Sequence, residues 1–239
     1  IDGVVKGNPK SLLLVEFAEE NMDENHRRLK KLHQLIGDLG YSWNKGIRNG
    51  GVVDVIDSNL QSKVSEMRKS GLNIMMSMKN DAKPVSFIED CAVELKDLAE
   101  YTDGLNKIFE KYNVKGTWYA HASVGCLHVR PVLNMKSQDD VDKMRNIANE
   151  TSSLVKKFKG SYSGEHGDGI ARSEFNEVMF GKKMTNIFKS IKNSFDPLNI
   201  FNPGKIVDAP KLDERDYFRY APSYNCLLYT SPSPRDLST

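Results

Sequence analysis

Two short segments that carry most of the histidines constrain the fold of this chain more than any other feature. One runs Tyr119-Ala-His-Ala-Ser-Val-Gly-Cys-Leu-His-Val-Arg-Pro131, and the other runs Ser163-Gly-Glu-His-Gly-Asp-Gly169. Only a folded loop can bring Glu165-His166 beside the imidazoles of His121 and His128, which lie seven residues apart. Two imidazoles and a carboxylate are the usual ligands of a catalytic divalent metal that keeps open coordination positions. The sequence therefore points toward chemistry.

The composition excludes several classes of protein. The chain has 239 residues, of which 39% are hydrophobic and 28% charged, so it is long enough and apolar enough for a folded core. A formal net charge of +2 is too small to indicate nucleic acid or an anionic membrane as a partner. No apolar run approaches the roughly 18 residues of a membrane span. The sequence begins at Ile1, without Met or a secretory pattern, so we expect that it starts inside a longer protein.

The cysteines favour a reducing compartment. Cys91, Cys126 and Cys226 are widely spaced and include no C-x-x-C pair. This segment therefore shows no pattern for an iron–sulfur or zinc–thiolate site, and no disulfide framework. We expect a cytoplasmic protein, with association at the membrane periphery as the alternative.

Hydrophobic periodicity predicts an alternation of helices and paired strands. Helices are expected over 24–39, 53–71, 95–112 and 137–159, with one or two more before Phe195. Strands are expected over 11–18, 74–78, 85–89, 117–119 and 127–132. Ser137-Gln-Asp-Asp140 resembles a capping box with Asp in place of Glu. Because the strands come mostly in adjacent pairs, without a βαβ rhythm, we expect an α+β fold with a largely antiparallel sheet covered by helices.

Three segments together resemble a known family. Tyr119–Pro131, Ser163–Phe175 and Asp196–Val207 are similar to the C-terminal, substrate-side domain of FAD-linked oxidases, which include D-lactate, glycolate and D-2-hydroxyglutarate dehydrogenases. The residue sequences of the two histidine segments resemble those of the branch of this family in which the flavin half is followed by an iron–sulfur half. The resemblance extends from about residue 10 to Tyr224.

The resemblance suggests a division of the chain. It implies a substrate and metal domain over 1–207, whose N-terminal FAD-binding half is missing, and a linker over 208–225 toward a missing C-terminal half. No glycine-rich phosphate cradle occurs before Ser11, in agreement with this. Residues 226–239 resemble translated adapter read-through, although they could also be a natural disordered tail.

The same resemblance implies roles for the histidine segments. It implies that His121, His128 and Glu165 bind a zinc-like divalent metal beside the flavin, and that His166 is the base that takes the substrate's hydroxyl proton. From the residues alone, both histidines of the first segment could instead be hydrogen-bonded core groups of a buried hairpin. His166 could equally orient Glu165 or bond backbone. Since neighbouring side chains point to opposite sides of an extended segment, His166 need not join the metal ligands.

Further residues are candidates for contacts with substrate and cofactor. Arg68 matches the family arginine that grips a substrate carboxylate, although it could be a solvated arginine at a helix end. Lys83 is a second candidate, displaced from the family lysine, and Arg130 could read a second carboxylate. Gly164, Glu165 and Asn202 are expected near the flavin, Asn202 within the Asn202-Pro-Gly-Lys205 ending that resembles the closing motif of the family.

The expected function is oxidation of a D-2-hydroxy acid by an FAD-dependent dehydrogenase of the D-lactate or D-2-hydroxyglutarate type. In the whole protein, hydride would pass to the flavin and electrons would leave through an iron–sulfur domain or subunit. The chain on its own should be inactive. Two alternatives stay open: a hydrolase in which metal held by His121, His128 and Glu165 activates water, and a noncatalytic binding module.

Overall fold

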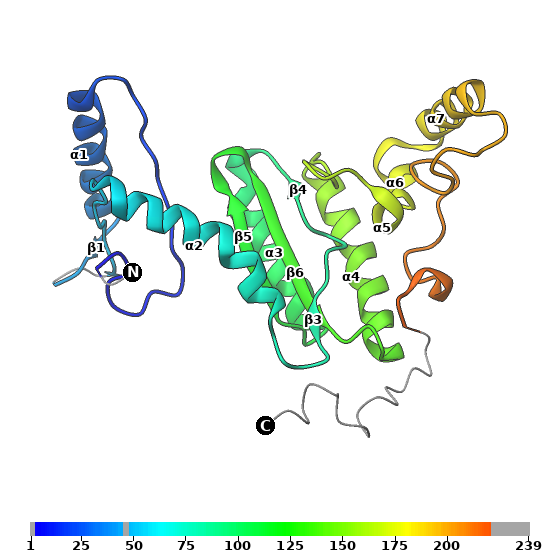
Figure 1. Ribbon diagram of the computed structural model, residues 1–239, viewed down its shortest axis with the longest axis horizontal. Helices are drawn as coiled ribbons and strands as arrows, with labels where there is room; N and C mark the ends of the chain where they lie inside the picture. Colours follow the sequence, from blue (N-terminus) through cyan, green and yellow to red (C-terminus); the bar gives the residue numbers. More distant parts are fainter. Residues whose placement is uncertain (1–2, 45–47, 221–239) are drawn as a thin grey trace, which may run out of the picture. The chain divides into compact units, whose positions relative to one another are not determined.

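The computed structural model describes residues 3–44 and 48–220, which form two compact units. One unit is Ile1–Ile74 and the other is Met75–Thr239. The fold is of the α+β class that the sequence predicts, and the second unit has helices beside a small antiparallel sheet (Figure 1). Residues 226–239, expected to be read-through or a tail, lie outside the described residues. The proposed division at residues 207 and 225 stays a prediction.

The described residues of the first unit include one helix, most of a second and one short strand pair. α1 spans Met22–Asp38, close to the predicted helix, and the side chain of Asn21 caps it by accepting from the amide of Asp23 at 2.9 Å. β1 (Tyr41–Ser42) and β2 (Arg48–Asn49) pair in parallel, and α2 covers Ser58–Met76.

The predictions of strands over 11–18 and 74–78 are wrong. Residues 11–18 form no strand, and Leu12, Leu13 and Leu14 are exposed. An apolar run forms a strand only where a neighbouring strand accepts and donates its backbone hydrogen bonds. Leucine has little strand preference of its own. The expected strand 74–78 is instead helical as far as Met76, because α2 continues through Gly71. A single glycine weakens a helix without ending it.

The sheet of the second unit is organised around one long strand. β6 (Cys126–Leu133) pairs antiparallel with β5 (Gly116–His121) along its length. It also pairs with two short strands, β3 (Lys83–Pro84) opposite Leu133 and Val132, and β4 (Cys91–Ala92) opposite Leu127 and Cys126. The hairpin predicted from 117–119 and 127–132 is thus confirmed. The strand expected over 85–89 is displaced to β3, because the chain turns at Asp90, whose φ is 59°.

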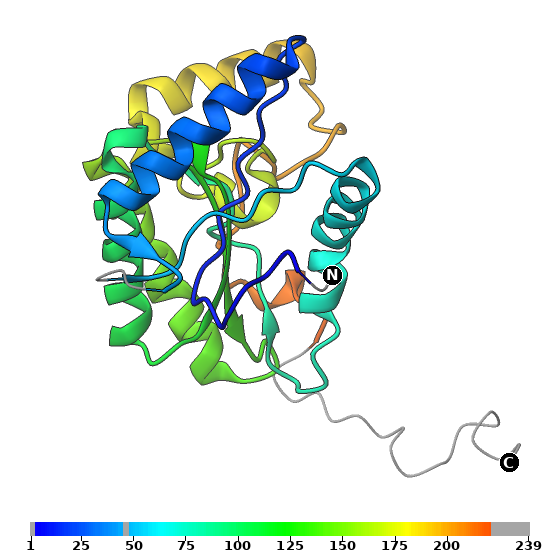
Figure 2. The same ribbon diagram turned by 90° about the vertical axis from the view of Figure 1, so that its left-hand side faces the viewer.

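Helices α3 and α4 pack beside this sheet (Figure 2). α3 spans Leu98–Lys111 after a 3₁₀ turn at Leu95–Asp97, and α4 spans Gln138–Lys157, both close to prediction. A 3₁₀ turn at Ala122–Val124 lies within the hairpin. The remaining helices are α5 (Gly169–Ser173), α6 (Asn176–Phe180), α7 (Lys182–Phe195) and a 3₁₀ turn at Arg215–Tyr217. Side chains of the sheet, of the segment between β3 and β4, and of α3 and α4 form the core, among them Phe87, Tyr101, Leu105, Val129, Leu133, Val141, Ile147 and Val155.

The expected capping box at the start of α4 does not form. Ser137 makes no side-chain capping bond. Its own amide donates to the carbonyl of Asn134 at 2.9 Å, and the carboxylate of Asp140 accepts from the amide of Asn134 at 2.8 Å. Asp140 therefore stabilises the turn that precedes the helix. Its side chain is shorter than that of Glu and is less suited to a capping box.

Within the described residues, no helix is both long and apolar enough to cross a membrane.

Candidate functional site

The hairpin brings the two histidines of the first segment together. Tyr119 lies opposite His128 in the β5–β6 register, and His121 lies two residues further along β5, so its side chain shares a face with that of Tyr119. The rings of His121 and His128 have centroids 4.9 Å apart. Gly125 closes the hairpin with φ 69°, and a Cβ there would lie 2.0 Å from the carbonyl oxygen of Val93. Glycine is therefore required at the turn that sets this register.

The loop of residues 163–168, hereafter the Glu165 loop, is anchored on buried Asp90. One carboxylate oxygen of Asp90 accepts from the amides of Glu165 at 2.7 Å and His166 at 2.9 Å, and its other oxygen pairs with Arg172. The Gly164 amide donates to the Asp90 carbonyl at 2.9 Å. A Cβ on Gly164 would lie 2.7 Å from that carbonyl oxygen, so a glycine allows this close approach. The role of Gly164 that the structure describes is therefore packing against Asp90.

The Asp90 carboxylate is held in its charged form. Burial alone would raise its pKa, but the Glu165 and His166 amides, together with Arg172, outweigh burial and lower the pKa below its usual value. Arg172 also donates to the carbonyls of Glu89 and Gly167. One buried ion pair therefore ties the Glu165 loop to the segment before β4.

The side chains of His121, His128 and Glu165 converge on one point. Glu165 Oε2 lies 3.4 Å from His128 Nε2 and 3.8 Å from His121 Nε2. One ligand atom from each of the three lies within 4.8 Å of the others. Two ligands of one zinc ion lie roughly 3 to 4 Å apart, so the three donors fit a divalent metal in both chemistry and spacing.

Burial and protonation also suit metal binding. His128 is only 7% exposed, whereas His121 and Glu165 are about a third exposed, at 35% and 39%. Burial lowers the pKa of His128 below its usual value, although the carboxylates of Glu165 and Glu89 act in the opposite direction. A neutral imidazole offers the lone pair that a metal needs. The partly open side leaves room for a further ligand.

His166 lies beside this cluster and does not point away from it. Its Nε2 is 3.9 Å from Glu165 Oε2, and its ring stacks with that of His128, with centroids 5.3 Å apart. The expectation that His166 and Glu165 point to opposite sides assumes an extended segment. Since both amides bind the same oxygen of Asp90, the loop is curled and both side chains stay near His128. His166 is 48% exposed and so is open to a substrate.

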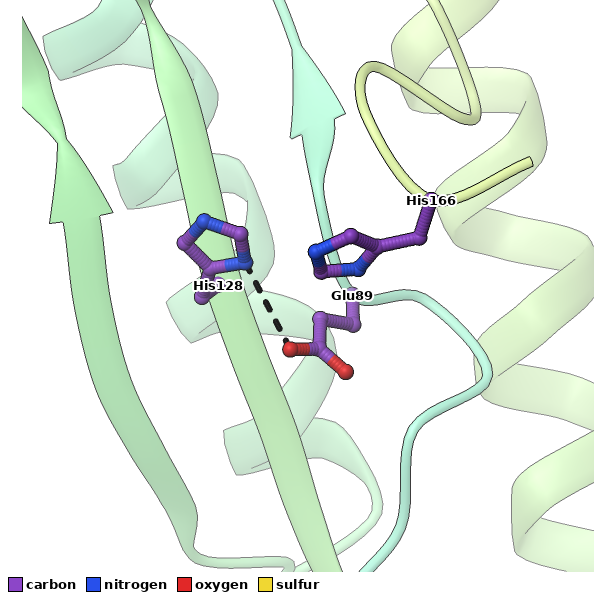
Figure 3. Close-up of side chains that lie close together, drawn as sticks. All are labelled: Glu89, His128 and His166. Atoms are coloured by element: carbon purple, nitrogen blue, oxygen red, sulfur yellow. Dashed lines mark ion pairs between the residues drawn. The ribbon is translucent and has the colours of Figure 1, made fainter. Parts of the chain in front are cut away.

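Sequence reasoning missed Glu89, which faces the other side of His128. Figure 3 shows the Glu89 side chain below the rings of His128 and His166, with a dashed line from its carboxylate to His128. Glu89 Oε1 lies 3.5 Å from His128 Nδ1. Glu89, His128 and His166 form a second group with metal-ligand spacing. The only signal in the sequence was an acidic pair, Glu89-Asp90, directly after the apolar residues Phe87 and Ile88. No spacing rule connects that pair to the histidines.

The predicted substrate residues come from three different elements. Arg130 is only 12% exposed, contacts Glu89 and donates from Nε to Ser86 Oγ at 3.0 Å. The carboxylate that it binds here is thus Glu89 of its own chain. Lys83 lies opposite Leu133 in the β3–β6 register. Leu133 is five residues along β6 from His128, which is about 17 Å at the usual rise of a strand. The Lys83 ammonium donates to the carbonyl of Met78. Arg68 lies in α2, whose first part belongs to the other compact unit.

Asn202 lies on an exposed turn after α7. Its φ is 46°, a left-handed conformation that Asn tolerates. Asp196 closes the turn before it, accepting from the amides of Ile200 and Phe201 at 2.9 Å each. Among the residues that the structure describes, no hydrogen bond or ion pair joins Asn202 to the histidine cluster.

Comparison with known proteins identifies relatives of this chain. The chain is 31% identical over 216 residues to a D-2-hydroxyglutarate dehydrogenase of Haemophilus influenzae, an alignment that covers 86% of the chain and 20% of the relative. It is 28% identical over 143 residues to the glycolate oxidase subunit GlcD of Bacillus subtilis, covering 60% of the chain and 30% of the relative. A D-lactate dehydrogenase of Archaeoglobus fulgidus is 32% identical over 125 residues, with 52% and 27% covered.

The chain spans about a fifth of the length of the D-2-hydroxyglutarate dehydrogenases that it matches. Residues 4–206 match the family model described as FAD linked oxidases, C-terminal domain. That range includes both histidine segments and most of the unit that brings them together. This chain therefore belongs to the family of FAD-linked oxidase C-terminal domains, the domain related to 2-hydroxy acid dehydrogenases.

Proposed function

We propose that this chain is the substrate-side part of an FAD-dependent D-2-hydroxy acid dehydrogenase of the D-lactate or D-2-hydroxyglutarate type. The observation that carries the proposal is the convergence of His121, His128 and Glu165 at one partly open site. Family membership supports it, because the relatives named above are dehydrogenases and an oxidase of 2-hydroxy acids.

In this proposal the three convergent side chains would hold a divalent, zinc-like metal ion. Such an ion polarises a hydroxyl that it binds and makes the proton easier to remove. His128 would be the buried ligand of this site, since its side chain is enclosed where β6 holds it. His121 and Glu165, which are more exposed, would border the opening through which the hydroxy acid enters.

His166 would take the hydroxyl proton on Nε2. Its place 3.9 Å from Glu165 and stacked on His128 puts it at the edge of the metal ligands. An imidazole is suited to this transfer because its ordinary pKa lies near neutral pH. The curled Glu165 loop holds the His166 backbone through its amide bond to Asp90.

The flavin would accept the hydride from the substrate carbon. Glu165, together with Asn202 and Gly164, is proposed to lie near the flavin. Asn202 sits among exposed apolar side chains, Phe195, Leu198, Ile200 and Phe201, and such a surface is suited to cover by a flat apolar ring or by another domain. The remaining flavin contacts are assigned to a part of the protein outside these 239 residues.

Arg68 and Lys83 are proposed as contacts of the substrate carboxylates. A guanidinium can bind two carboxylate oxygens at once, which favours Arg68 for the carboxylate beside the hydroxyl. Arg130 is the weaker candidate for a second carboxylate, because Glu89 already binds it. Electrons are proposed to leave through an iron–sulfur domain or subunit of a cytoplasmic protein. The length of the D-2-hydroxyglutarate dehydrogenases beyond the matched part leaves room for such a domain.

The test is turnover by the full-length gene product that contains this chain. Purified protein is assayed with D-2-hydroxyglutarate, D-lactate and glycolate and an artificial electron acceptor, before and after treatment with a chelator. The proposal predicts flavin reduction by at least one of these acids, lost on chelation and restored by zinc. A protein that carries flavin but whose flavin is reduced by none of the three acids would contradict it.

A further inference from the structure

Glu89 is a buried acid that the proposed reaction does not use. Its side chain is 8% exposed and lies in the segment between β3 and β4. Its two partners, His128 and Arg130, both come from β6, where they lie two residues apart and so share one face of the strand. Buried carboxylates are costly unless they are paired, so the position of Glu89 is specified by these two partners.

Arg130 fixes the Glu89 carboxylate in place. The guanidinium binds Glu89 Oε1 and is itself oriented by Ser86, whose Oγ accepts from Arg130 Nε at 3.0 Å. The same oxygen, Oε1, faces His128 Nδ1 at 3.5 Å. A cation bound at Oε1 would meet the guanidinium at close range, so Glu89 is better suited to hold His128 than to bind a metal itself.

His128 therefore lies between two carboxylates, one buried and one partly exposed. Its Nδ1 faces buried Glu89, and its Nε2 faces the Glu165 oxygen at 3.4 Å. A neutral imidazole carries one proton, which makes one ring nitrogen a donor and leaves a lone pair on the other. Glu165 is 39% exposed and can turn toward an ion, whereas Glu89 is held by Arg130.

We propose that Glu89 is a positioning residue that keeps the His128 proton on Nδ1 and so leaves the Nε2 lone pair directed at the site shared with His121 and Glu165. A carboxylate behind a ligating histidine fixes its tautomer and orientation, and loss of such a partner typically weakens metal affinity about 10- to 100-fold. The inference rests on the metal site of the proposed function. It assigns Arg130 to hold Glu89, in place of a substrate carboxylate.

The experiment combines NMR of the histidine ring nitrogens with calorimetric zinc titration, on the complete 239-residue chain. In the wild-type chain without metal, His128 should carry its proton on Nδ1. The Glu89→Gln variant keeps the shape but loses the charge, so the two tautomers should mix and zinc should bind about 10- to 100-fold more weakly. Arg130→Lys, which keeps a charge but lacks the fork, should show a smaller loss of affinity. The visible spectrum of bound Co²⁺ should keep its bands in Glu89→Gln, because the ligand set is unchanged.

Glu174→Gln is the matched control. Glu174 is a partly buried glutamate that pairs with Arg145 at 2.9 Å, in the same unit. Its replacement also breaks a Glu–Arg pair and should leave the His128 tautomer and zinc affinity unchanged.

A wild-type His128 with its proton on Nε2 would overturn the inference, and this readout needs no variant to fold. Unchanged zinc affinity in a folded Glu89→Gln variant would overturn it as well, and changed Co²⁺ bands would show Glu89 to be a ligand instead. A wild-type chain that bound no zinc, yet kept the proton on Nδ1, would contradict the metal part of the proposed function while confirming the tautomer that Glu89 sets.

Discussion

The histidines of the β5–β6 hairpin and the Glu165-His166 pair of the Glu165 loop reach the same cluster by different means. His121 and His128 are placed by the register of two adjacent strands and by one glycine turn, all within eight residues. The Glu165 loop has no strand pairing of its own at these residues. It depends on Asp90, 75 residues earlier, and on the pairing of Asp90 with Arg172. The hairpin is thus specified locally, whereas the loop depends on one buried ion pair.

Removing that ion pair should have the largest effect. In Asp90→Ala, the amides of Glu165 and His166 lose their acceptor and Arg172 stays buried at 7% exposure without its partner. Loss of one partner of a buried pair costs about 3–5 kcal/mol. Urea denaturation measures the free energy of unfolding. The exposed pair of Asp103 with Lys107 supplies the control, Asp103→Ala, which should cost less than about 1 kcal/mol. Equal costs for the two variants would contradict the role given to Asp90.

The hairpin is tested by Gly125→Ala. The new Cβ would meet the Val93 carbonyl oxygen at 2.0 Å, and a positive φ of 69° disfavours alanine as well. Crowding costs about 1–3 kcal/mol and the left-handed conformation about 1–2 kcal/mol, so we expect a loss of about 3 kcal/mol. NMR should show the His121 and His128 resonances shifting together, with smaller shifts at Glu165. Shifts confined to the Glu165 loop would contradict local control by the hairpin.

Gly164→Ala should have a smaller effect on the loop. The added Cβ would lie 2.7 Å from the Asp90 carbonyl oxygen, but no positive φ adds strain, and we expect a loss of about 1–3 kcal/mol. The comparison is Gly167→Ala, where nothing lies within 4 Å and only the φ of 76° is unfavourable, at about 1–2 kcal/mol. Loss of amide-exchange protection at Glu165 in Gly164→Ala alone would identify the close approach to Asp90 as the cause.

The two regions should also respond to different pH ranges. Burial lowers the folded-state pKa of His128, so its neutral form stabilises the fold above the usual histidine value of about 6.5 and this contribution is lost as the pH falls below it. The pKa of Asp90 is lowered by its hydrogen bonds despite burial, so its contribution persists down to about pH 4 and is lost below that. Amide resonances monitored from pH 7 to 3 should change first near His128 and only later at Glu165 and His166. The reverse order would contradict this comparison.

What the sequence could predict follows the same division. The strands over 117–119 and 127–132 were expected on either side of the first histidine segment, and the apolar stripe of α4, with Val141, Met144 and Ile147, predicted a buried helix face. Both are local patterns. The site residues of the two histidine segments could be named for the same reason. Their roles in metal binding and proton transfer stay predictions.

The partners of the site could not be predicted, because they depend on contacts between distant parts of the chain. Glu89 is recognisable only once β6 places His128 and Arg130 on one face. The curl that keeps His166 near Glu165 depends on Asp90. The apolar run 12–15 misled for the opposite reason, since its composition carries no information about whether a strand partner exists.

The measurement that most directly tests the account is the zinc stoichiometry of the chain and of three single variants. The wild-type chain should bind one zinc ion. His128→Ala and Glu165→Ala should each lower the zinc affinity by more than about 100-fold, the upper end of the loss expected when a residue that only orients a ligand is replaced. His33→Ala is the control, because His33 pairs with Asp54 in the other unit and should bind zinc normally. Wild-type zinc affinity in a folded His128→Ala variant would contradict the central claim that the hairpin and the Glu165 loop meet to form one metal site.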